Sequence, residues 1–87
     1  MENTLREFVD NEAVANLILK RFRVVKYTLH ADSRSVGYWF EDSPALEQAW
    51  MEYLNGQSRV EPQDFYSQVR FLTSFRIYLQ GGDPNGK

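Results

Sequence analysis

The sequence contains no cysteine and only one histidine, His30, and these two shortages exclude several kinds of chemistry. Without cysteine the chain can form no disulfide, no thiolate nucleophile and no cysteine-ligated zinc site. One histidine leaves no HExxH motif, and the acidic residues do not follow the spacing of a calcium-binding loop. We therefore expect no metal, no cofactor and no enzymatic activity.

His30, the single histidine of the chain, is the candidate for a general base. A base of this kind needs an orienting carboxylate and a nucleophile close by. Asp32, Ser33 and Ser35 are near in sequence, but these residue types are also common in turns. The pattern favours a turn at the end of a strand over a catalytic site.

Glycine is sparse, and no glycine-rich phosphate-binding loop is present. Long apolar runs are also missing, since none approaches the roughly 18 residues that a membrane-spanning helix requires. The first twelve residues, MENTLREFVDNE, are acidic and lack the apolar segment of a signal peptide. We expect a cytoplasmic protein with no membrane partner.

The length of 87 residues indicates a single small domain, which we place at residues 1–80. Thirteen aromatic residues give this short chain large side chains with which to build a core. Residues 81–87, GGDPNGK, contain no apolar side chain, so we expect a flexible C-terminal tail.

The net charge of −2 is small, but the charges are unevenly distributed. Residues 20–34 carry five basic side chains against one acidic side chain, whereas both flanking segments are acidic. This pattern predicts either charge pairing within the domain, which we favour, or a weak binding patch for a polyanion.

The pattern of apolar residues predicts an α+β domain of order β-α-β-β-α-α, with a small three-stranded or two-stranded antiparallel sheet packed with three helices. Residues 5–9 fit a short edge strand or one helical turn. Asp10 is a suitable cap for a helix over residues 11–21. Residues 23–30 and 35–40 form a hairpin, in which Val25, Tyr27 and Leu29 alternate with polar residues as in a half-buried strand. The second hairpin strand should be central, with the sheet order 1-3-2.

Two helices complete the predicted domain. Ser43 and Pro44 open a helix that ends at Leu54, before Asn55-Gly56. A last helix begins at Glu61-Pro62 and runs to about Gln80. Its main apolar stripe comprises Phe65, Val69, Leu72, Phe75 and Leu79, widened by Phe71 and Tyr78.

The last helix carries more apolar residues than one face can bury. Tyr66 and Ile77 lie away from the main stripe, with Arg70 and Thr73 on the same ridge. Together with Trp39, these residues are our predicted contacts for a protein partner or for a second copy of the chain. If residues 5–9 cover the ridge, it is simply part of the core.

The favoured function is therefore non-enzymatic protein binding, as an adaptor or inhibitor. The alternative is a weak nucleic-acid-binding module that uses the basic segment. Its candidate residues are Lys20, Arg21, Arg23, Lys26 and Arg34.

The order of elements and several short segments resemble a family of small domains of unknown function found in bacteria and their phages. The segments are AVANLILKRF, RVVKYTL, YWFEDSP, YLNG and VEPQDF, and the resemblance covers about residues 8–79. It implies a compact α/β domain of phage or mobile-element origin, and it implies no activity. The chain departs from this family at Lys20-Arg21-Phe22, where the first helix often ends at a glycine.

Overall fold

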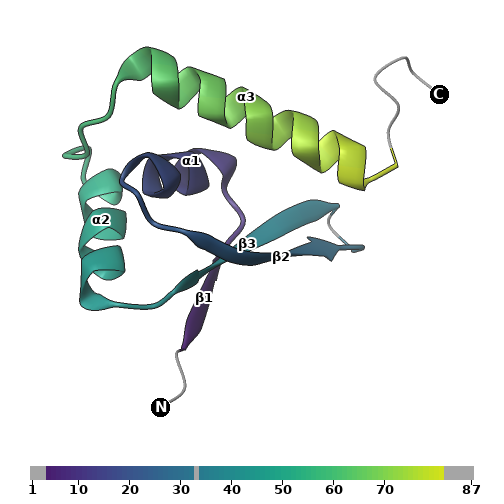
Figure 1. Ribbon diagram of the computed structural model, residues 1–87, viewed down its shortest axis with the longest axis horizontal. Helices are drawn as coiled ribbons and strands as arrows, with labels where there is room; N and C mark the ends of the chain where they lie inside the picture. Colours follow the sequence, from purple (N-terminus) through teal and green to yellow (C-terminus); the bar gives the residue numbers. More distant parts are fainter. Residues whose placement is uncertain (1–3, 33, 82–87) are drawn as a thin grey trace.

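The computed structural model describes residues 4–32 and 34–81, which form three strands and three helices (Figure 1). The elements are β1 (Leu5–Phe8), α1 (Asn11–Leu19), β2 (Val24–His30), β3 (Ser35–Glu41), α2 (Pro44–Leu54) and α3 (Pro62–Leu79). This order confirms the predicted β-α-β-β-α-α sequence of an α+β domain. Apart from Gly81, the predicted flexible tail lies outside the described residues.

The three strands form one antiparallel sheet with the order β1-β3-β2, as predicted. Strand β3 is central, because β1 pairs with one of its edges and β2 with the other. The pairing of β2 with β3 is regular from Lys26↔Trp39 to His30↔Ser35, and an irregularity of register lies between Val24 and Lys26. One edge of β1 and one edge of β2 therefore pair with no other strand among the described residues.

The predicted first helix is two residues too long, since α1 ends at Leu19. Asp10 caps its start by accepting a hydrogen bond from the Glu12 N–H. At its end Arg21 adopts a left-handed conformation, with φ of 75°. The N–H of Arg21 donates to the carbonyl of Ile18 and that of Phe22 to Leu17. These two bonds form the helix ending in which glycine is usual at the left-handed position.

The starts of the other two helices are also fixed by local sequence. The Ser43 hydroxyl accepts a hydrogen bond from the Leu46 N–H, and Pro44 occupies the first turn of α2. Glu61 caps α3 in the same way through the Asp64 N–H, again with proline next to it. Proline suits this position because the first helical N–H groups have no partner within the helix.

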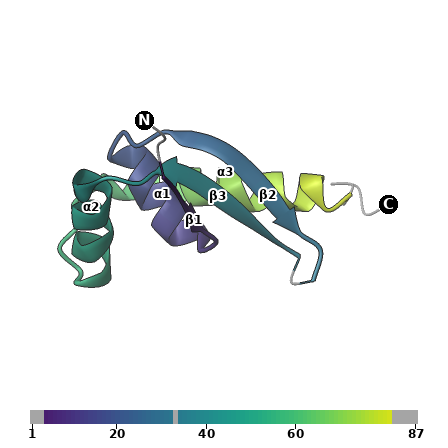
Figure 2. The same cartoon turned by 90° about the horizontal axis from the view of Figure 1, so that it is seen from below.

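The helices cover one face of the sheet, as Figures 1 and 2 show: α1 lies between the sheet and α3, and α2 packs at one end. The side chains of β3 that point to this face are buried, and alternate residues point to the other face. The core consists of residues from the sheet and all three helices, namely Phe8, Val14, Ala15, Leu17, Val36, Tyr38, Phe40, Leu46, Ala49 and Leu72. Burial of this surface is the main stabilising term of so small a domain.

Two expectations about burial are wrong. Val25, Tyr27 and Leu29 of β2 are 41–50% exposed, because the helices cover the β2 side of the sheet only in part. Phe71 and Tyr78 do not join the buried stripe of α3, since they are 61% and 71% exposed. Large apolar side chains therefore remain on the surface where β2 and α3 lie near each other.

Candidate protein-binding surface

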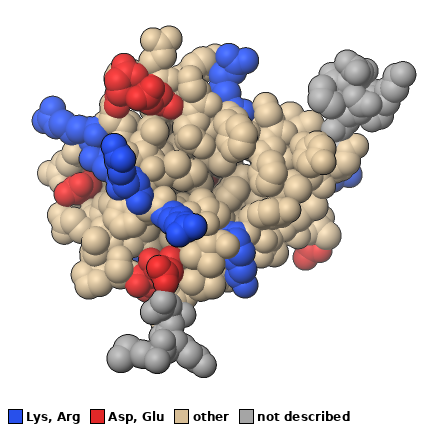
Figure 3. Space-filling view, viewed as in Figure 1, with Lys and Arg blue, Asp and Glu red and all other residues tan. Residues whose placement is uncertain are grey.

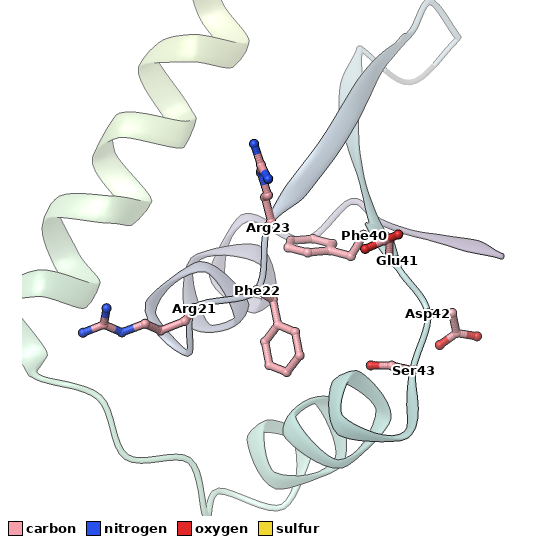
Figure 4. Close-up of a pocket in the computed structure, with 7 residues that line it drawn as sticks. All are labelled: Arg21, Phe22, Arg23, Phe40, Glu41, Asp42 and Ser43. Carbon is pink, nitrogen blue, oxygen red and sulfur yellow. The ribbon is translucent and has the colours of Figure 1, made fainter. Parts of the chain in front are cut away.

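A pocket of about 440 Å³ lies where the α1–β2 and β3–α2 connections meet (Figure 4). Its lining residues are Arg21, Phe22, Arg23, Phe40, Glu41, Asp42 and Ser43. The two phenylalanine rings lie at its centre, while Arg21 points away on one side and Asp42 away on the other (Figure 4). Catalysis needs polar groups that converge on a reacting atom. The charged groups of this pocket diverge, so it offers no such constellation.

The second candidate for chemistry is His30, which the fold brings close to Glu7. The distance between His30 Nε2 and Glu7 Oε2 is 2.5 Å. The two residues lie on the opposite edge strands of the sheet, with the central strand between them, and on the face away from the helices. This carboxylate is 23 positions away in sequence, and the sequence pattern did not indicate it.

Among the described residues, Ser35 is the nucleophile named from the sequence that lies beside this pair. Asp32 is exposed in the turn after β2, and Ser33 lies outside the described residues. Ser35 pairs with His30 in the sheet register and has interactions of its own. The Glu7–His30 pair is therefore a cross-strand contact that links both edge strands over β3.

Trp39 lies beside this pair on the open face of the sheet. Its Nε1–H donates a hydrogen bond of 3.0 Å to the Thr28 hydroxyl. The Lys26 ammonium lies 5.0 Å from the centroid of the indole ring, as in a cation–π contact. These contacts hold the side chain of Trp39 against the open face of the sheet, where it is half-buried.

Six apolar residues, of which all but Phe75 are exposed, form an area that we call the β2–α3 surface. They are Val25, Tyr27 and Leu29 of β2 and Phe71, Phe75 and Tyr78 of α3. The rings of Tyr27 and Phe75 meet edge to face, with centroids 5.3 Å apart. Phe71 stacks on Phe75 at 6.2 Å. These contacts join the edge strand and the last helix into one continuous aromatic surface.

The same area is poor in charge. The space-filling view in Figure 3 shows acidic and basic side chains over the left part of the molecule. The area over the C-terminal half of α3 and the β2–β3 hairpin is largely free of them (Figure 3). An exposed apolar patch without interspersed charges is typical of a protein interface.

The residues predicted to bind a partner do not form a single surface. Trp39 lies on the open face of the sheet, whereas Tyr66, Arg70, Thr73 and Ile77 lie on α3, behind the opposite face. The Thr73 hydroxyl accepts a 3.3 Å hydrogen bond from the Asn11 amide at the start of α1.

The rest of this ridge is accessible. Tyr66 is 62% exposed, Ile77 is 44% exposed, and the Arg70 guanidinium lies 5.6 Å from the Tyr66 ring centroid. Residues 5–9 do not cover it, because Leu5–Phe8 is strand β1 on the sheet. Helix α3 thus has two exposed apolar flanks, one beside Tyr27 and one beside Asn11.

The basic residues of the alternative prediction are separated by the fold. Arg21 and Arg23 line the pocket of Figure 4, and Lys26 lies over Trp39 on the open face. Arg34 belongs to the turn at the other end of β2. A strand of this length spans about 20 Å, so Arg34 and the Lys20–Arg23 region do not share one small patch.

Two tyrosines have perturbed acidity. Burial raises the pKa of Tyr38 by disfavouring the phenolate, and the positive charge of Arg76 acts in the opposite direction. Burial also raises the pKa of Tyr53, and the negative charges of Asp10 and Glu12 add to that effect. Both tyrosines are therefore neutral at physiological pH, and neither belongs to the β2–α3 surface.

Residues 4–32 and 34–81 contain no cluster of three or more histidine or acidic side chains placed to hold a metal ion. Within the same ranges, no helix combines the length and the apolar character that crossing a bilayer would demand.

Sequence reasoning assigned Phe71 and Tyr78 to the core and so missed two residues of the β2–α3 surface. A signal was present: at 100° per residue, the two residues lie about 100° and 120° around the helix from Leu72 and about 160° and 180° from Val69, outside one buried face. No protein-family model matches this chain, and no curated protein or solved structure is significantly similar to it.

Proposed function

We propose that this chain is a non-enzymatic protein-binding domain, acting as an adaptor or inhibitor, and that its partner docks on the β2–α3 surface. The observation that carries the proposal is the exposure of Tyr27, Phe71 and Tyr78, at 50%, 61% and 71%. Ring contacts through Phe75 connect Tyr27 with Phe71, and helical spacing places Tyr78 on the same side of α3. Tyrosine and other aromatic residues are enriched among the residues that dominate binding energy.

The edge of β2 supports the same proposal. Its outer backbone groups pair with no strand in the described part of the chain, so they are free to add a strand from a partner. Strand addition supplies main-chain hydrogen bonds, and neighbouring side chains supply specificity. At this edge the neighbouring side chains are the apolar residues of β2 itself and the rings of α3.

The polar sites support binding over catalysis. The charged groups of the Figure 4 pocket diverge, and the Glu7–His30 pair, beside which Ser35 lies, bridges the two edge strands of the sheet. The β2–α3 surface, in contrast, offers area and shape but little reactive chemistry.

Affinity capture from the organism that encodes the chain tests the proposal. We expect the tagged protein to retain a specific partner. An untagged copy of the same chain counts as such a partner. The variant Phe71→Ser/Tyr78→Ser should lose that partner with little change in thermal stability, because both side chains are mostly exposed.

The matched control is Tyr66→Ser/Ile77→Ser, which removes a similar pair from the other flank of α3. It should retain the partner. Loss of the partner in the control, with retention in Phe71→Ser/Tyr78→Ser, would move the binding site to the ridge predicted from sequence.

A further inference from the structure

We infer that the partner of the β2–α3 surface is a second copy of this chain, bound through antiparallel pairing of the two β2 edges. This inference rests on the proposed function, since it names the occupant of the same surface. The resulting sheet would have six strands, and a two-fold axis would pass through the β2–β2 pair. Such an interface is self-complementary by symmetry, as is usual in dimers.

The regular part of β2 sets the register of this pairing. The irregularity between Val24 and Lys26 leaves Lys26–His30 as the straight segment, and its middle residue is Thr28. Pairing centred on Thr28 places Tyr27 opposite Leu29 of the second copy, and Leu29 opposite the second copy's Tyr27. Aromatic and aliphatic cross-strand pairs of this kind stabilise a sheet.

The charges on the open face agree with the same register. A pairing centred on Lys26 would place two ammonium groups opposite each other, which is unfavourable. Centring on Thr28 avoids this contact, because it places each Lys26 opposite His30 of the second copy.

The helices extend the contact beyond the strands. Two antiparallel strands of one sheet are related by an axis perpendicular to the sheet, so both copies keep their helices on the same side. The α3 flank that bears Phe71, Phe75 and Tyr78 lies on the β2 side, because Phe75 contacts Tyr27. The two-fold axis therefore places this flank of α3 opposite the same flank of α3 in the second copy. The aromatic rings of the two copies meet on the helix side of the paired strands.

The available area suits a dimer. A stable interface covers about 800 Å² on each partner, which is about an eighth of the 6384 Å² surface of this chain. From their exposed fractions, the rings of Tyr27, Phe71 and Tyr78 alone offer roughly 300–450 Å². Val25, Leu29 and the outer backbone of β2 add to that area, whereas edge strands alone would present a much smaller contact.

Sedimentation of the purified protein from about 1 µM to about 500 µM tests the inference. We expect the mass to rise with concentration to twice the 10.2 kDa of one chain. Leu29→Lys and Tyr78→Ser should each weaken the dimer at least tenfold while the circular dichroism spectrum stays unchanged. Tyr66→Ser removes a similarly exposed ring from the other flank and should leave the dimer intact.

Two outcomes would overturn the inference. One is a wild-type protein that stays at 10.2 kDa over the whole concentration range. The other is a dimer that survives Leu29→Lys and Tyr78→Ser but dissociates with Tyr66→Ser. Neither outcome decides the proposed function, which the capture experiment tests separately. If the wild-type chain captures a different protein and Phe71→Ser/Tyr78→Ser does not, a partner still binds this surface.

Discussion

The carboxylate of Glu7 lies directly across the backbone of Gly37. A methyl group built at Gly37 would fall 1.6 Å from Glu7 Oε2 and 2.4 Å from Glu7 Cδ. From this position the carboxylate reaches His30 on the far strand, at 2.5 Å. Glycine in the middle of β3 is thus explained by a side chain that crosses the central strand and connects both edges of the sheet.

Gly37→Ala should therefore displace Glu7 and break its contact with His30. We expect a loss of about 1–3 kcal/mol in the free energy of unfolding, the usual cost of an overpacked site. Urea denaturation measures this change. In the Glu7→Ala background the clash is absent, so Gly37→Ala should be neutral or stabilising there. An equal loss in both backgrounds would show that Glu7 is not the cause.

Arg21→Gly should stabilise the domain. Arg21 holds a left-handed φ of 75° at the end of α1, a conformation that costs a residue with a side chain about 1 kcal/mol relative to glycine. The gain is partly offset because glycine also gives the unfolded chain more freedom. We expect an increase of about 0.5–1 kcal/mol in the free energy of unfolding, measured by urea denaturation.

The end of α2 provides the matched control for Arg21→Gly. Gly56 has the same left-handed conformation, with φ of 70°, and a methyl group there would meet no atom within 4 Å. Gly56→Ala should therefore destabilise the domain by about 1 kcal/mol through backbone strain alone. If Arg21→Gly also destabilises, the Arg21 side chain makes a contribution larger than the strain.

The raised pKa of Tyr38 predicts that the domain loses stability in alkaline solution. Burial raises this pKa, so above about pH 10 the unfolded chain releases the phenolic proton while the folded chain retains it. The free energy of unfolding then falls as pH rises towards the pKa of the folded state, and below pH 10 this effect is absent. Tyr38→Phe removes it and should flatten the decline above about pH 10.

Denaturation of the Tyr38→Phe protein at pH 7 gives a second result. The Tyr38 hydroxyl is buried and has no hydrogen-bond partner among the described residues. Removing an unpaired buried hydroxyl costs little, so stability at pH 7 should be unchanged or slightly higher. A marked loss at pH 7 would mean that the hydroxyl is satisfied in solution.

The sequence predicted the fold well because its local signals agree with one another. Ser43-Pro44 and Asn55-Gly56 delimit α2 at the observed residues. The alternation over the two hairpin strands gave the pairing of β2 with β3, and the predicted sheet order 1-3-2 is confirmed. Each of these signals acts over a few residues, where propensity and capping dominate.

The surface was harder to predict because exposure depends on how far one element covers another. Periodicity placed Phe71 and Tyr78 beside the buried stripe of α3, but α1 packs against the centre of that stripe and leaves its flank open. The contact between Glu7 and His30 links positions 23 residues apart. No local pattern encodes this contact, and the helical spacing of Phe71 and Tyr78 was only a partial signal, because their exposure also depends on the angle at which α1 and α3 pack.

The most direct measurement of the central claim is site-specific photo-crosslinking in cells of the encoding organism. A photoreactive amino acid replaces Tyr78 in one protein and Tyr66 in another; these side chains are 71% and 62% exposed, on opposite flanks of α3. We predict a discrete protein adduct from position 78, absent when Leu29→Lys is also present, and none from position 66. An adduct from position 66 alone, or from neither position, would contradict the assignment of the β2–α3 surface as the binding site.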